Sequence, residues 1–179
     1  MEYYTKQLTR SQIRKLAPIF RRLFDVSPSG PFPAVEALEK IPDVFEGSTF
    51  EVVENNELDI NHPAKCEIMT DGTFNIKIRQ DVYDGARLHR IGAYRGFIVH
   101  ELCHPFLYKI GYTPIMERSF ENGTITATCS SEWQAKALCG EVMMPYEETE
   151  PMGYRYIAKE YGVSNGSAYY RKFMYREDL

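Results

Sequence analysis

The run Gly96-Phe97-Ile98-Val99-His100-Glu101-Leu102-Cys103-His104 lies near the middle of the chain and decides how the rest is interpreted. It contains the pattern H-E-x-x-H, in which two histidines are four residues apart. Apolar residues surround the pattern and indicate a largely buried helix, which we expect over 92–110. Side chains at i and i+4 project from one face of a helix, so the imidazoles of His100 and His104 can reach a single metal ion.

Glu101 follows the first histidine and is rotated off the face that the two histidines share. Its carboxylate is therefore expected to reach a metal-bound water rather than the metal. Zinc lowers the pKa of such a water toward 7, and Glu101 can accept its proton as a general base. The pattern thus predicts a zinc site with Glu101 as the catalytic residue. The alternative is that the two histidines are structural and Glu101 is a surface residue.

A catalytic zinc needs a third protein ligand, and no histidine follows His104 in the sequence. Cys129 and Cys139 remain candidates, although thiolates are typical of closed structural sites. A carboxylate from a later helix is favoured, and Glu132 is the best candidate. Glu141 lies nine residues further along the same predicted helix and faces nearly the opposite side, so the two glutamates cannot both be ligands.

Hydrophobic periodicity and turn residues indicate the order helix, sheet, helices, which is an α+β fold. Strands are expected over 49–54, 66–70 and 74–79, and the last two flank Asp71-Gly72, a strong hairpin signal. The strand over 74–79 alternates apolar and polar residues, so one of its faces is solvated. We also expect it to form the sheet edge along which an extended peptide substrate pairs.

Further helices are expected over 10–24, 34–40 and 130–144, with two short helices in 154–175. Thr9 is the predicted cap of the first helix. Residues 1–25 carry six basic and two acidic side chains, and the basic face of this helix is expected to be solvated, or else to contact an acidic partner. The predicted organisation is an N-terminal helical region over 1–60 packed on the rest, a core over 61–153 and a C-terminal helix pair over 154–179.

Composition excludes several classes of protein. The 179 residues are 44% hydrophobic and 26% charged, as in a globular protein, and the net charge of −4 is too small to suggest nonspecific DNA binding. No apolar run approaches the about 20 residues that cross a bilayer, and no signal peptide is recognisable, so a cytoplasmic location is expected. The four cysteines contain no CxxC pair and are expected to be reduced thiols.

The chain resembles the ImmA/IrrE family of zinc metallopeptidases. The resemblance rests on His100-Glu101-Leu102-Cys103-His104, on Glu132-Trp133-Gln134-Ala135 followed by Glu141-Val142-Met143-Met144-Pro145, and on the tail after Ile157, and it covers roughly 66–175. It implies a zincin-like fold, in which we expect a small antiparallel sheet packed with the H-E-x-x-H helix and a third-ligand helix. It also implies that His100, His104 and Glu132 bind Zn²⁺ and that Glu101 is the base.

The sequence departs from the family pattern at Cys103, Pro105 and Lys136. Cys103 is expected to be a small packing residue rather than a redox or inhibitory ligand. Pro105 removes one helical hydrogen bond just past the ligands, where a kink should spare metal binding. Lys136 lies one turn after Glu132, where it can crowd the site with charge or pair with that carboxylate when metal is absent.

The resemblance implies a specific endopeptidase that cleaves a protein, in this family a helix-turn-helix repressor of phage, mobile-element or stress regulation. The alternative is a non-proteolytic antirepressor in which the metal only holds the shape. Direct nucleic-acid binding is not expected, because the tail after Gly162 offers few basic residues. The oxyanion-stabilising residue is left open among six candidates: Tyr94, Arg95, Tyr108, Tyr112, His62 and His89.

Overall fold

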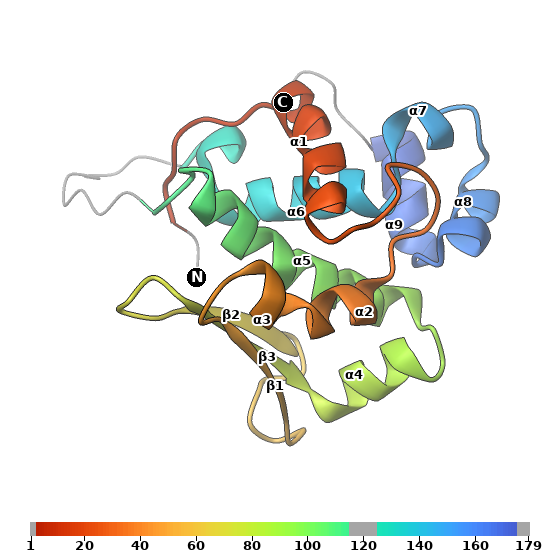
Figure 1. Cartoon of the computed structure of the whole chain (residues 1–179). Coiled ribbons are helices and arrows are strands. Elements are labelled where there is room, and N and C mark those ends of the chain that lie inside the picture. Colours follow the sequence, from red (N-terminus) through yellow and green to blue (C-terminus); the bar gives the residue numbers. More distant parts are fainter. Residues whose placement is uncertain (1–2, 115–124, 175–179) are drawn as a thin grey trace.

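A computed structural model of the chain describes residues 3–114 and 125–174 (Figure 1). The fold is α+β, as expected. The helices are α1 (Arg10–Leu23), α2 (Ala34–Glu39), α3 (Ile41–Val44), α4 (Gln80–Arg87), α5 (Gly92–Lys109), α6 (Ser131–Met143), α7 (Tyr146–Thr149), α8 (Tyr154–Tyr161) and α9 (Asn165–Tyr169), with a short 3₁₀ turn η1 (Ala127–Cys129) and a π-helical turn η2 (Tyr170–Met174). The strands are β1 (Thr49–Val53), β2 (Ala64–Ile68) and β3 (Phe74–Arg79).

The three strands form one mixed sheet in the order β1-β3-β2. The predicted hairpin joins β2 and β3 as an antiparallel pair, whereas β1 pairs parallel to β3. The expectation of an antiparallel sheet was therefore wrong for β1. The chain leaves β1 at one edge of the sheet and enters β2 at the opposite edge, and β3 then returns between them, parallel to β1. For the same reason β3 is the central strand, and the prediction that it forms an edge was also wrong.

One face of the sheet belongs to the hydrophobic core. Phe74, Ile76 and Ile78 alternate along β3 and are at most 1% exposed, while Asn75 and Lys77 lie on the other face. Phe50 and Cys66 are the register partners of Ile76 on the two outer strands, so they share this apolar face. The period-two pattern in the sequence thus identified which face of the sheet is covered.

Helix α5 is the central element of the molecule. It lies between the sheet on one side and α1 and α6 on the other, with α2 packed beside it and α4 leading into it (Figure 1). Its residues Ile98, Val99 and Leu102 are completely buried, whereas Phe97 is 39% exposed. Pro105 does not end this helix, which continues to Lys109. The H-E-x-x-H segment is therefore held by core packing on both sides of its helix.

Helix α1 begins at the predicted cap. Thr9 accepts a hydrogen bond from the backbone N–H of Gln12, and the Gln12 side chain accepts one from the N–H of Thr9. The basic face of α1 is not uniformly solvated, which corrects the expectation for this helix. Arg10 is 4% exposed, and Arg21 is 1% exposed because its guanidinium donates to four backbone carbonyls, including Val142 O of α6 at 2.5 Å.

The end of the chain forms the predicted pair of short helices, α8 and α9, around a turn at Gly162 in the left-handed conformation. Residues 175–179 of the predicted C-terminal region lie outside the described residues. The N-terminal region over 1–60 contributes β1 to the sheet as well as α1 to α3. Among the described helices, none combines the length and the apolar character that crossing a bilayer requires.

Candidate metal centre

Helix α5 places the two histidines of the pattern side by side. His100 and His104 are one turn apart, and their ring centroids are separated by 4.9 Å with the planes nearly perpendicular. Their Nε2 atoms are 3.3 Å apart and both point into the same space. The two rings are less than a quarter exposed, so the helix packing that buries their neighbours also limits how far the rings can turn.

Helix α6 brings Glu132 to the same point. The helix begins at Ser131, with Ser130 as its cap, so Glu132 lies in the first turn. Its Oε2 is 3.2 Å from Nε2 of His100, and its Oε1 is 3.7 Å from Nε2 of His104. Within the described part of the chain, these three residues form the group of possible metal ligands, with all donor atoms within 4.8 Å of one another.

The geometry of this group fits a zinc ion. Four ligands at about 2.0–2.1 Å from a tetrahedral zinc are separated from one another by about 3.3–3.4 Å. The separations of 3.2, 3.3 and 3.7 Å between His100, His104 and Glu132 are close to those edges. Two imidazoles and one carboxylate are also a donor set typical of catalytic zinc, which keeps its fourth position for water or substrate.

The pKa values of the two histidines are shifted in opposite directions. Burial and the neighbouring His100 lower the pKa of His104 to about 4, so His104 is neutral at pH 7 and its ring can offer a lone pair. Burial also opposes protonation of His100, but its hydrogen bond to Glu132 and the charges of Glu101 and Glu132 raise its pKa overall. The same hydrogen bond lowers the pKa of Glu132. A metal ion bound at this point would take the place of the hydrogen bond between His100 and Glu132.

Glu101 faces the sheet rather than the group of three. Its Oε2 accepts a hydrogen bond of 2.7 Å from the backbone N–H of Cys66 in β2. Burial raises the pKa of this carboxyl, the effect that prepares a carboxylate to hold a proton. Glu101 therefore connects the helix that carries the histidines to β2, one of the two outer strands of the sheet.

The start of α6 is held by the N-terminal segment, which the sequence did not predict. Tyr4 forms an isolated bridge with Ser130, and the backbone N–H groups of Thr5 and Leu8 donate to Cys129 O and Thr128 O, both at 2.8 Å. This pairing fixes the turn immediately before Glu132. A single bridged residue has no periodicity, so the sequence held no signal for this contact.

Gln134 strengthens the same connection. Its side chain is completely buried, and its Nε2 donates to Lys6 O and Thr128 O, both at 2.8 Å. Here only an amide can serve both carbonyls, because a carboxylate has no N–H to donate.

The other candidates from the sequence lie elsewhere. Cys129 and Cys139 are outside the ligand group, and Cys139 donates to Gly96 O instead. Glu141 is also outside the ligand group, and it is buried in a bidentate ion pair with Arg171, at 2.9 and 2.8 Å.

The three departures from the family pattern leave the ligand group intact. Cys103 is completely buried, and burial raises the pKa of its thiol well above the usual value. Lys136 is exposed and forms no ion pair with Glu132 among the described side chains. Of the oxyanion candidates, Arg95 is engaged by Phe32 O at 2.6 Å and Gly162 O at 3.0 Å.

Comparison with known proteins adds a likeness of fold. No family model matches the chain, and no curated protein matches its sequence. Among solved structures, a transcriptional regulator of Mycobacterium tuberculosis is similar, with a TM-score of 0.54 and 11% sequence identity. The match covers 94% of this chain and 48% of the regulator, so this chain spans about half the length of that protein.

Proposed function

We propose that the chain is a zinc-dependent endopeptidase of zincin-like fold. The observation that carries the proposal is the convergence of His100, His104 and Glu132, from two helices, with the spacing of a tetrahedral site. The position of Glu101 beside them supports hydrolysis over a purely structural metal, because a structural site needs no adjacent base.

In this proposal, His100, His104 and Glu132 would hold the zinc, which would supply Lewis-acid activation of the scissile carbonyl and of a water at the site. Glu101 accepts a proton from that water and later donates it to the leaving amine. Its raised pKa suits both steps, since a carboxyl that is too acidic is a poor donor. The hydrogen bond from Cys66 N holds one carboxylate oxygen and leaves the other to act on the proton.

The outer edge of β2 is the proposed path for the substrate. Lys65 of β2 lies opposite Lys77 of β3, and Glu67 lies opposite Asn75. The backbone hydrogen bonds at the two ends of the pairing, Arg79 N to Pro63 O and Met69 N to Thr73 O, show that these are the hydrogen-bonded positions of the antiparallel pair. The backbone groups of Ala64, Cys66 and Ile68 therefore point away from β3. An extended peptide can pair as an added strand with the backbone groups of Ala64 and Ile68 and with the Cys66 carbonyl, next to Glu101, which accepts the Cys66 N–H.

The proposed substrate is a protein, specifically a helix-turn-helix repressor, as the family resemblance implies. The neighbour described as a transcriptional regulator gives this proposal a regulatory context. A bond in an extended segment suits the edge of β2 better than a bond inside a helix, because helical backbone groups are already paired.

The test compares cells that express the wild-type chain with cells that express Glu101→Gln. We expect new protein N-termini in the wild-type cells that are absent with the variant, while both proteins contain the same amount of zinc. Identical N-termini in the two cultures would contradict the proposal.

The second candidate is a metal-stabilised binding module that inactivates its partner without cleaving it. It is favoured by the Cys66 hydrogen bond, which engages Glu101 before any substrate arrives. If the protein is such a binding module, the Glu101→Gln variant would inactivate the partner to the same extent as the wild type. The same pair of proteins therefore separates the two candidates.

A further inference from the structure

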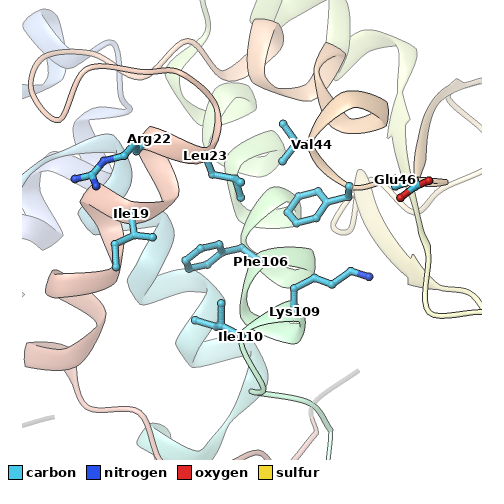
Figure 2. Close-up of a pocket in the computed structure, with 9 residues that line it drawn as sticks. Ile19, Arg22, Leu23, Val44, Glu46, Phe106, Lys109 and Ile110 are labelled. Atoms are coloured by element: carbon cyan, nitrogen blue, oxygen red, sulfur yellow. The ribbon is translucent and has the colours of Figure 1, made fainter.

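An apolar groove lies outside the metal centre, on the side of α5 that faces α1 and α3. Its volume is about 560 Å³. Figure 2 shows its lining, which comes from α1, from the end of α3 and from the last turn of α5; the apolar members are Ile19, Leu23, Val44, Phe45, Phe106 and Ile110. Nothing in the proposed reaction uses this surface.

The groove gathers large apolar side chains that remain accessible to water. Ile19 is 51% exposed, Leu23 39% and Ile110 41%. Ile19 and Leu23 are four residues apart on the outward face of α1, while the inward face of that helix supplies Phe20 and other residues to the core. Single exposed apolar residues are ordinary, but several around one hollow are typical of an interaction site.

The charges around the groove favour an acidic partner. Arg22 and Lys109 lie on opposite sides of it, and Glu46 is the single acidic residue in the lining (Figure 2). Arg22 is exposed and has no carboxylate partner among the described side chains. The ammonium of Lys109 lies 3.4 Å from Gly72 O and 5.4 Å from the centre of the Phe74 ring, and it forms no ion pair within the described residues, although its charge helps to lower the pKa of Asp71.

The walls of the groove favour a helical partner over an extended one. They are formed mainly by helices, whose backbone N–H and C=O groups are already paired, so the groove offers side-chain packing and few free backbone groups. An extended segment would bury unpaired backbone groups against this apolar surface, whereas a helix pairs its own. The two outer strands of the sheet, β1 and β2, contribute no residue to the lining of this groove.

We propose that this groove binds an amphipathic helix of a protein partner, with apolar side chains at i, i+4 and i+7 and acidic residues beside them. The apolar side chains pack between Leu23 and Ile110, and the acidic residues approach Arg22 and Lys109. This is the helix-in-groove mode of recognition. The proposal does not depend on the metal centre or on proteolysis.

The test uses two fluorescent model helices of about 18 residues. Both have leucines at i, i+4, i+7 and i+11, and they differ only in flanking glutamates or lysines. We expect the glutamate helix to bind the wild-type chain, measured by fluorescence anisotropy, at least about fivefold more tightly than the lysine helix. Leu23→Asp should weaken its binding at least about tenfold, whereas Ile60→Asp, a change at a 74% exposed residue outside the groove, should not.

Charge reversal tests the proposed orientation. Arg22→Glu should weaken binding of the glutamate helix by about two- to fivefold and strengthen binding of the lysine helix, the range expected for exposed charge pairs. Arg155→Glu, at an exposed position of α8, is the matched control and should change neither. Absence of binding to the wild type, or equal binding to Leu23→Asp with its fold intact by circular dichroism, would overturn the proposal.

Discussion

Replacing Gln134 by glutamate tests how α6 is held at the metal centre. The Gln134 amide donates to Lys6 O and Thr128 O, both at 2.8 Å, from a completely buried position. Gln134→Glu preserves the shape of the side chain but removes both N–H donors. An ionised carboxylate would face two carbonyl oxygens, so the folded protein is expected to keep the introduced group protonated, with one O–H bonded to one carbonyl.

The cost of this change follows from the protonation. An ordinary glutamate has a pKa of about 4.3, so holding it neutral at pH 7 costs about 3.7 kcal/mol, at 1.36 kcal/mol per pKa unit. Loss of one hydrogen bond adds about 1 kcal/mol. The free energy of unfolding should therefore fall by about 4–5 kcal/mol at pH 7 but by only about 2 kcal/mol at pH 5.

The sign of this pH dependence is fixed by proton binding. Above the unfolded pKa, the folded variant holds a proton that the unfolded chain has released, so its stability relative to the wild type falls as the pH rises. Urea unfolding of both proteins at pH 5, 6 and 7 measures the difference. Gln134→Met, which removes the donors without adding an acid, is the control and should lose about 2 kcal/mol at every pH. An equal loss for Gln134→Glu at pH 5 and pH 7 would refute the reasoning.

Three further predictions test other contacts. Glu141→Gln breaks the buried pair with Arg171, at 2.9 and 2.8 Å, and should lower the free energy of unfolding by about 3 kcal/mol in urea; a loss below about 1 kcal/mol would show that the pair is unimportant. Gly162→Ala places a Cβ 2.0 Å from Arg95 Nη1 at a φ of +60°, and should lower the unfolding free energy by at least about 1 kcal/mol, whereas unchanged stability would show that the turn adapts freely. Deleting residues 1–8 removes the segment that holds the start of α6, and should weaken zinc binding about tenfold in a competition titration. Unchanged zinc affinity would show that core packing alone positions Glu132.

The convergence of His100, His104 and Glu132 could be predicted from the sequence because the relevant patterns are local. The i, i+4 spacing of His100 and His104 requires only a helix, and the apolar residues around them indicated one. Glu132 followed from the need for a third ligand together with the family resemblance. The opposite orientation of Glu141 on the same helix followed from the helical period, and its burial against Arg171 agrees with it.

The errors concern contacts between segments that are far apart in the chain. The parallel pairing of β1 with β3 depends on which side of the hairpin the chain passes, and no residue near β1 encodes that choice. Burial of Arg21 depends on four backbone carbonyls, three in the loop after α1 and one on α6. A helical wheel indicates only that Arg21 lies on the polar face of α1. The charge pattern therefore predicted a solvated side chain, which was wrong.

The measurement that tests the central claim most directly is the zinc affinity and zinc content of the wild type, Glu132→Ala and Glu51→Ala. Competition titration gives the affinity, and elemental analysis gives the content. Glu51 is an exposed glutamate of β1 and serves as the control. The account predicts one zinc per chain in the wild type and the control, and at least about a hundredfold weaker binding in Glu132→Ala. Absence of zinc binding in the wild type, or equal affinity in Glu132→Ala, would contradict it.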